Sequence, residues 1–347
     1  MDTVTQAPAD LVVERFDPLG DADALQAWVD CAEASERQVF GDRHTAWTVR
    51  ELREEVRLDD ACEELFFLAR RGGVPSGAGR AVLSLRDNRH LADLELAVHP
   101  RDRRAGVGSA LLTAMEEVTA ERGRTSIRVE SNVRLVQSDP AEPFATRHGY
   151  RSAQVDLRSD LDLPQDLDEL LMPLEDEAAR FSADYDVLTW WDDVPQQWRA
   201  DRARCAVDMS TDAPSGEVDV EAEDWDEARV ARMLEILRAQ GRRFVETVAV
   251  HRPTGRMVAF TDVVAPPHAP DMAFQWDTLV VGEHRGHRLG QLVKAANLRA
   301  LHRELPDVAW LCTWNAESNE PMLRVNRAMG FRPVGRTTEW LKQTART

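Results

Sequence analysis

The chain has 347 residues, with 43 Lys and Arg against 61 Asp and Glu, so its formal net charge is −18 at pH 7. This length predicts two domains or one large one, and 43% hydrophobic with 30% charged residues is typical of a soluble globular protein. The negative charge argues against nonspecific binding to nucleic acid or to anionic membranes, which requires a basic surface.

Short apolar stretches alternate with helical patterns in the first half of the chain. In chain order we expect a strand at Leu11–Phe16, helices at Asp21–Ala34 and Thr48–Leu58, strands at Glu64–Arg70, Arg80–Arg86 and Leu91–Val98, a helix over 105–122, a strand at Ser126–Glu130, a short helix ending near His148, and a strand from Tyr150. The helix over 105–122 places Val107, Leu111, Met115 and Val118 on one face.

The second half repeats this order. We expect a strand at Val187–Trp191, helices near 195–208 and 224–240, strands at Arg243–Val250, Met257–Val264 and Met272–Val281, a helix over 287–303, a strand at Val308–Cys312, a helix at 319–329, and a strand from Phe331. Residues 157–180, between the halves, hold eight acidic residues and two arginines. They predict a solvated linker with a short acidic helix, and the alternative is a charged rim that guides a cationic substrate.

A weak internal repeat runs through the chain. Residues 94–112, LELAVHPRDRRAGVGSALL, correspond to residues 276–294, WDTLVVGEHRGHRLGQLVK. The pairs Arg103/Arg285 and Glu95/Asp277 are 182 residues apart, and the glycines of RHGYR and RAMGFR are 181 apart. A nearly constant separation indicates two copies of one fold. We therefore expect an N-terminal domain at 1–160, an acidic linker with a helix at 161–182, and a C-terminal domain at 183–347.

The loop RRAGVG, at 103–108, follows a strand and opens an amphipathic helix. Small residues allow a ligand to approach the backbone, and the free N–H groups at a helix N-terminus favour an anion such as a diphosphate. Several strands precede the loop, so it is not the first turn of a Rossmann fold, and no Lys-Ser or Lys-Thr pair follows it as in a P-loop.

The loop resembles the acetyl-CoA loop of the GNAT superfamily of N-acetyltransferases, whose pattern is Arg/Gln-x-x-Gly-x-Gly/Ala. The helix that ends in Gly-Tyr or Gly-Phe before a strand, seen as RHGYR and RAMGFR, is similar to that family's closing element. The second half is similar to tandem acetyltransferases of actinobacteria through HRGHRLG and TWNAESN. The resemblance implies an α/β fold of two tandem GNAT-like domains, each with a mixed, mostly antiparallel central sheet flanked by helices.

The resemblance also implies which residues bind acetyl-CoA, the expected acyl donor. In the first copy these are Leu96, Val98, Arg103, Arg104, Ala105, Gly106, Val107, Gly108 and Ser109; in the second they are Leu279, Val280, Arg285, Gly286, His287, Arg288, Leu289, Gly290 and Gln291. The second copy departs from the pattern, because Arg288 stands where the first glycine is expected. Any need for a positive φ there is harder to meet.

Acyl transfer to an amine requires a base, and protonation of the departing thiolate favours it. Glu95 and Asp277 are the candidate bases, since each lies on the strand that leads to its loop; the alternative is a carboxylate facing solvent or paired with arginine. The family commonly has a tyrosine acid four residues before the closing glycine, where this chain has Ala145 and Asn326. Asn326 can donate a hydrogen bond to the thiolate. Solvent or another residue then supplies the proton, or one copy is silent.

Polar residues gather at strand positions of the second copy, which favours chemistry there. Gln275, Thr278, Asn315 and Asn319 are candidate substrate-binding residues, as a polar cluster at a sheet opening indicates. The alternative is ordinary caps and turns, with Asn319 as the N-cap of the next helix.

We expect an N-acetyltransferase that acetylates a primary amine of a small molecule or peptide by direct attack in a ternary complex. The alternatives are a non-catalytic protein that binds acyl-CoA or an antibiotic, and a transferase with a longer acyl donor. The first residues lack a secretory pattern, no run reaches the roughly 18 apolar residues of a membrane span, and the four cysteines form no CxxC pair. We expect a cytoplasmic monomer or homodimer without metal, nucleic-acid or membrane partners; His284 and His287 lack a third ligand.

Overall fold

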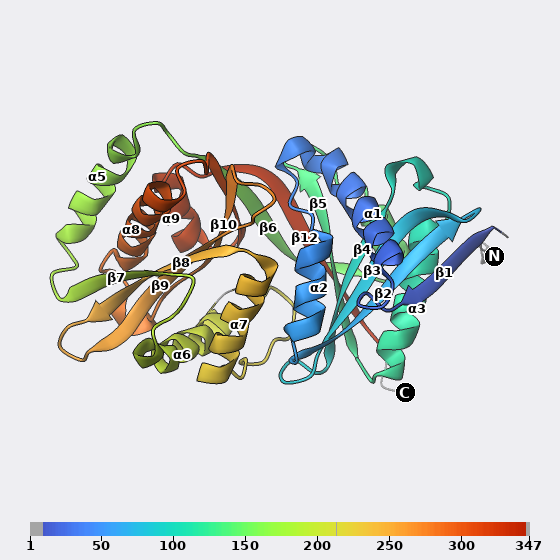
Figure 1. Cartoon of the computed structure of the whole chain (residues 1–347), viewed down its shortest axis with the longest axis horizontal. Coiled ribbons are helices and arrows are strands. Elements are labelled where there is room, and N and C mark those ends of the chain that lie inside the picture. The colour runs from blue at the N-terminus through green and yellow to red at the C-terminus, as the bar shows by residue number, and fades with distance from the viewer. Residues whose placement is uncertain (1–9, 213, 345–347) are drawn as a thin grey trace. The chain divides into compact units, whose positions relative to one another are not determined.

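The computed structural model describes residues 10–212 and 214–344, and Figure 1 labels its helices and strands. Residues 1–9, where the stretch without a secretory pattern begins, lie outside the described residues. The chain divides into two compact units: unit 1 holds Met1–Val155 with Thr337–Thr347, and unit 2 holds Asp156–Arg336. Within the described ranges, none of the helices combines the length and the apolar character needed to cross a bilayer.

Unit 1 is a sheet with helices on both faces. Its elements are β1 (Leu11–Phe16), α1 (Ala22–Phe40), α2 (Val49–Leu58), β2 (Cys62–Arg71), β3 (Val74–Ser84), β4 (Leu91–Val98), α3 (Val107–Glu121), β5 (Ser126–Arg134), α4 (Glu142–Arg147) and the start of β6 (Arg151–Asp162). The strand order is β1-β2-β3-β4-β5, and β12 (Arg332–Gln343) lies beside β5. Strands β1 to β4 pair antiparallel, whereas β4 and β5 pair in parallel.

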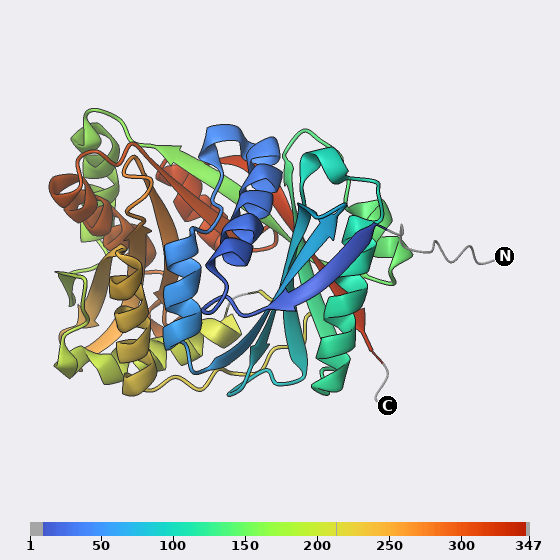
Figure 2. The ribbon, with the colours of Figure 1, turned by 45° about the vertical axis from the view of Figure 1, so that its right-hand side comes forward.

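The helices of unit 1 pack against the sheet through their apolar faces. Leu25 and Trp28 of α1 pack on one face of the sheet, and Leu111 and Met115 of α3 pack on the other, as Figure 2 shows for the two helices. Gly79 of β3 permits the close approach of α3, because a Cβ there would lie 2.9 Å from the sulfur of Met115. The pattern that predicted α3 is therefore the pattern that forms this core.

Unit 2 repeats this arrangement and adds one helix. Its elements are the rest of β6, α5 (Leu167–Ala179), β7 (Tyr185–Trp191), α6 (Gln196–Asp212), α7 (Glu227–Gln240), β8 (Arg243–His251), β9 (Arg256–Ala265), β10 (Met272–Val280), α8 (Leu289–Glu304), β11 (Trp310–Ala316), α9 (Glu320–Ala328) and the start of β12. The strand order is β6-β11-β10-β9-β8-β7. Helices α6 and α7 lie on one face and α8 on the other (Figure 1). Strands β10 and β11 pair in parallel, as β4 and β5 do in unit 1.

The predicted helices and strands are confirmed, although several ends differ. The first helix extends to Phe40 rather than Ala34, and the strand expected at Val308–Cys312 runs from Trp310 to Ala316.

The prediction of a solvated linker at 157–180 is wrong for its first residues. Residues 157–162 belong to β6 and pair antiparallel with β11, and the side chain of Arg158 is fully buried. The acidic helix is present as α5, but Leu167 and Leu171 on one of its faces belong to the core of unit 2. The compact units divide the chain differently from the predicted domains at 1–160 and 183–347. Pairing with β11 places the end of β6, from Asp156, in unit 2, and Thr337–Thr347 belong to unit 1.

Candidate functional site

The two predicted loops have the same local construction. Each begins with one turn of 3-10 helix, Pro100–Asp102 in unit 1 and Gly282–His284 in unit 2, and leads into α3 or α8. The Nε of Arg103 donates to the carbonyl of Val98 at 3.4 Å, and the Nε of Arg285 donates to the carbonyl of Val280 at 3.2 Å. The two arginines that the repeat aligns therefore make the same contact with the end of the preceding strand.

The backbone also follows the same path through both loops, with glycine and arginine exchanged. In unit 1, Arg104 has φ +64° and Gly106 has φ +85°; in unit 2, Gly286 has φ +86° and Arg288 has φ +57°. The glycine position of the pattern thus requires a left-handed residue in both copies. Arg288 adopts that conformation at a cost of about 1–2 kcal/mol.

Both loops present backbone donors at the N-terminus of a long helix. In the described part of the chain, no hydrogen bond occupies the N–H groups from Arg103 to Ser109 or from Gly286 to Gln291. Such groups, together with the helix dipole, form an anion-binding site.

The surroundings of the loops differ. In unit 1, Gly108 faces the ring of Phe144, and the hydroxyl of Ser109 lies 3.0 Å from Nε2 of His148. In unit 2, helix α5 covers the start of α8: Glu177 pairs with Arg288 at 2.8 Å and accepts from Nε2 of Gln291 at 3.2 Å. A carboxylate therefore lies beside the second loop, where it competes with an incoming anion.

The histidines of the second loop contact a tyrosine. Nδ1 of His284 lies 2.9 Å from the hydroxyl of Tyr185, and the ring of His251 lies 4.7 Å from that of His284. Desolvation, and next the neighbouring His251, lower the pKa of His284. Nδ1 of His287 lies 3.1 Å from the carbonyl of Phe181. Across residues 10–212 and 214–344, no three His, Cys, Asp or Glu side chains are arranged to hold a metal ion.

In unit 1, the candidate base Glu95 is paired with arginine. It lies on β4 directly opposite Arg80 of β3, whose Nη1 contacts it at 3.1 Å. Arg80 is 2% exposed and also binds Glu64 at 2.6 Å and Glu55 at 3.0 Å. Desolvation raises the pKa of Glu95, and Arg80 opposes this effect. Desolvation also raises the pKa of Glu64 to about 7, against the attraction of Arg80.

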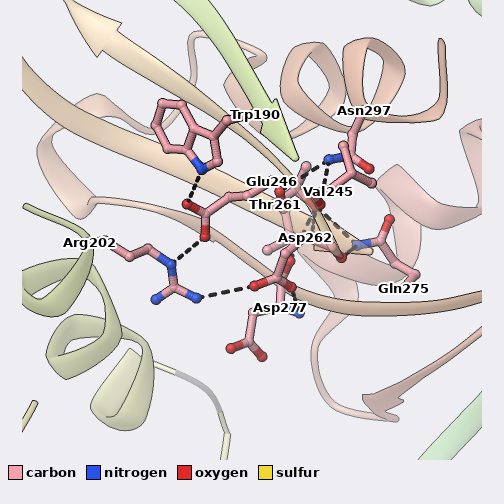
Figure 3. Close-up of polar contacts among 10 residues, drawn as sticks. Trp190, Arg202, Val245, Glu246, Thr261, Asp262, Gln275, Asp277 and Asn297 are labelled. Carbon is pink, nitrogen blue, oxygen red and sulfur yellow. Dashed lines mark hydrogen bonds and ion pairs between the residues drawn. The ribbon is translucent and has the colours of Figure 1, made fainter. Parts of the chain in front are cut away.

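In unit 2, Asp277 lies at a bulge of β10, between Gln275 and Thr278, beside Asp262 of β9. Figure 3 shows that Asp262, not Asp277, binds the arginine. Oδ1 of Asp262 accepts the backbone N–H of Asp277 at 2.8 Å, and Oδ2 accepts from Arg202 of α6 at 3.1 Å. Arg202 also donates to Glu246 at 2.5 Å.

Asp277 is an exposed residue, and among the described residues its carboxylate makes no hydrogen bond or ion pair. Desolvation raises the pKa of Asp277, and Arg202 opposes that change. Like-charge repulsion from Asp277, added to desolvation, raises the pKa of Asp262. An unpaired carboxylate whose pKa is raised has the properties of a general base.

The structure separates the candidate substrate-binding residues. Gln275 and Thr278 are buried: Nε2 of Gln275 donates to the hydroxyl of Thr261, which lies 2.8 Å from that of Thr278. Asn319 caps α9 by accepting the N–H of Met322, as the alternative interpretation predicted. Asn315 accepts from Nδ2 of Asn326 at 2.6 Å. These contacts support the sheet and the caps.

The general acid position is occupied by packed residues. Asn326 is 3% exposed and commits its amide to Asn315, while Ala145 is buried. The hydroxyl of Tyr150 donates to Glu116 at 2.8 Å. The described residues thus place no tyrosine at the expected point.

Sequence reasoning missed Arg80, Arg202, Asp262 and Lys294. Lys294 lies on α8 with 1% exposure, and its Nζ is 5.3 Å from the centre of the Phe331 ring. Desolvation lowers the pKa of Lys294 to about 7, although Asp262 opposes it. One signal was available: Lys294 interrupts the apolar face that continues from Leu289 and Val293.

Comparisons with known proteins support one family. The model of the acetyltransferase (GNAT) family matches residues 27–150. A tandem GNAT protein from the clavulanic acid biosynthesis pathway is 27% identical with a TM-score of 0.79, over 97% of this chain and 99% of that one. Among curated proteins, none matches the chain.

Two further structures share the fold. A GCN5-related N-acetyltransferase from Sphaerobacter thermophilus is 18% identical with a TM-score of 0.67, over 97% of both chains. An acetyltransferase from Pyrococcus horikoshii is 11% identical with a TM-score of 0.58, over 100% of this chain and 94% of that one. Residues 27–150 therefore match the GNAT acetyltransferase family, and the chain is similar over nearly its whole length to a protein that carries two GNAT units in tandem.

Proposed function

We propose that the chain transfers the acetyl group of acetyl-CoA to a primary amine of a small molecule or peptide, by direct attack in a ternary complex. The observation that carries this proposal is the repeated loop: free N–H groups at the start of α3 and α8, behind left-handed residues at equivalent points. The diphosphate of CoA is the anion that such a loop suits. Among the described residues, no carboxylate pairs with the loop of unit 1. In unit 2, Glu177 contacts the loop through Arg288 and has to move away before the diphosphate can bind.

We assign the chemistry to unit 2 because Asp277 has an unpaired carboxylate, whereas Glu95 is bound by Arg80. Asp277, directly or through a water molecule, takes a proton from the substrate ammonium. The amine nitrogen then forms a bond to the thioester carbon, the carbon–sulfur bond breaks, and the nitrogen releases its second proton to solvent. Because Asn326 is committed to Asn315, the departing thiolate receives its proton from solvent.

The test is to incubate the protein with acetyl-CoA and a panel of amines while following free thiol. We expect turnover, and we expect Asp277→Asn to lower kcat by about 10²- to 10⁴-fold with CoA binding intact. Glu95→Gln, the same chemical change at the aligned position of unit 1, is the matched control and should retain activity. If calorimetry detects no CoA binding, the whole proposal is wrong; if only Glu95→Gln abolishes turnover, the chemistry belongs to unit 1.

The absence of a tyrosine acid in the described residues favours one second candidate, a non-catalytic protein that binds acyl-CoA or an antibiotic. It predicts CoA binding without thiol release from any amine. A panel of donors that includes longer acyl-CoA thioesters separates both candidates from a transferase with a longer donor.

A further inference from the structure

We propose that Asp262 is a positioning residue for Asp277, an inference that rests on the proposed role of Asp277 as the general base. Asp262 fixes the backbone of the β10 bulge and holds Arg202 away from the carboxylate of Asp277. The base is then left unpaired and available to the substrate.

The first step is the geometry of the bulge. A bulge re-aims the side chains of a strand, and this one begins after Gln275 and ends before Thr278. The N–H of Asp277 lies inside the irregular segment, where the ladder of β9 and β10 does not pair it. Oδ1 of Asp262 accepts that N–H at 2.8 Å. Asp262 is 1% exposed, so its side chain replaces a ladder bond in a place that water does not reach.

The second step is the fate of the arginine. Arg202 donates from Nε to Glu246 and from Nη2 to Asp262, and its guanidinium carbon lies 3.9 Å from the centre of the Phe260 ring. Two carboxylates and a ring therefore fix the guanidinium. Figure 3 shows these two contacts and none that reaches the carboxylate of Asp277.

The third step is the comparison with unit 1. Arg80 and Asp262 are 182 residues apart, the same separation as Glu95 and Asp277, so they hold the same place in the two sheets. In unit 1 that place is an arginine, which binds the candidate base at 3.1 Å. In unit 2 it is an aspartate, and the arginine comes from a helix instead. Arginine at this position pairs with the carboxylate of Glu95 in unit 1, whereas aspartate at the same position leaves the carboxylate of Asp277 unpaired among the described residues of unit 2.

The charges around Asp277 fix the expected direction of change. Asp262 of β9 and Glu246 of β8 are the negative groups on this face, Arg202 of α6 is the positive group, and Lys294 of α8 interacts with Asp262. Asp262→Asn removes a like charge and releases one arm of Arg202 toward Asp277. Both effects stabilise the ionised form, so the pKa of Asp277 falls.

The experiment measures kcat/KM against pH for the wild type, Asp262→Asn and Asp262→Ala. We expect the acid limb to move to lower pH in both variants, and kcat to be lower in Asp262→Ala because the asparagine oxygen can still accept the N–H of Asp277. Thr247→Val is the control, since it alters a buried contact of the neighbouring strand without changing charge. It should leave the limb in place. A limb that does not move in folded Asp262→Asn would overturn the proposal.

A second measurement separates this proposal from the proposed function. Carboxyl carbon-13 resonances of labelled aspartate, with Asp277 assigned from Asp277→Asn, report its titration without any turnover. If the wild type acetylates no amine, the proposed function fails; a lower titration midpoint of Asp277 in Asp262→Asn would still support the role of Asp262. An unchanged midpoint would refute that role whether or not the protein is active.

Discussion

Lys294 is a buried lysine, and the free energy of unfolding that its charge costs can be measured by substitution. It is one of only two lysines in the chain, and burial lowers its pKa from 10.5 to about 7. Replacement with methionine keeps most of the side-chain volume and removes the charge. We expect Lys294→Met to stabilise unit 2 at pH 6.5.

The magnitude follows from the pKa. The difference between 10.5 and about 7 corresponds to about 5 kcal/mol, at about 1.4 kcal/mol for each pH unit. The contact of Nζ with the Phe331 ring is lost in the variant and offsets about 2 kcal/mol. The expected gain in the free energy of unfolding is therefore about 3 kcal/mol.

The sign of the pH dependence provides the sharper test. The folded state binds Lys294 protons more weakly than the unfolded state, so the penalty is complete below pH 7 and disappears as the pH rises toward 10.5. Urea unfolding at pH 6.5, 8 and 9.5 should show the advantage of Lys294→Met shrinking steadily. Lys342→Met is the matched control, because it makes the same chemical change at a lysine of unit 1 that pairs with Glu116. An advantage independent of pH, or a less stable Lys294→Met at pH 6.5, would refute the reasoning.

Three further predictions concern the loops and the arginine cluster of unit 1. Gly106→Arg should lower the free energy of unfolding by about 1–2 kcal/mol, whereas Arg288→Gly should be neutral or stabilising, because relief of the left-handed backbone offsets the loss of an exposed ion pair; thermal unfolding of both variants checks the contrast. Glu177→Gln should tighten CoA binding by unit 2 by about fivefold, as roughly 1 kcal/mol of repulsion disappears; calorimetry with the loop of unit 1 blocked measures it, and unchanged affinity would contradict the competition. The pKa of Glu64 rises from 4.5 to about 7 on folding, so this group should lower the free energy of unfolding of the wild type by about 3 kcal/mol as the pH increases from 4.5 to 7. Denaturant titrations of Glu64→Gln over the same pH range should lack that component.

Local patterns account for the part of the fold that could be predicted. The apolar face of α3 lies within one stretch of sequence, as does the alternation of loop and helix in both repeats, so neither depends on distant partners. The alignment of Arg103 with Arg285 also required only spacing, and the structure gives both the same carbonyl contact.

Long-range pairing accounts for what could not be predicted. Residues 157–162 look like an acidic linker because their partner strand, β11, lies about 150 residues further along the chain. The pairing of Glu95 with Arg80, and the freedom of Asp277 beside Asp262, depend on strand register and on an arginine from another helix. The burial of Lys294 could not be predicted either, because hydrophobic periodicity places lysine on the solvent side of a helix.

The passage of β12 into unit 1 affects the order in which the protein can mature. Thr337 and the residues that follow it leave the ribosome after all of unit 2 has been synthesised, yet Trp340 belongs to the apolar core of unit 1 and donates from Nε1 to Ser131 at 2.7 Å. The sheet of unit 1 therefore lacks the strand that pairs with β5 until the whole second repeat has been translated. A nascent chain that ends before residue 337 leaves the edge of β5 unpaired, and an unpaired edge is a template for pairing with another chain.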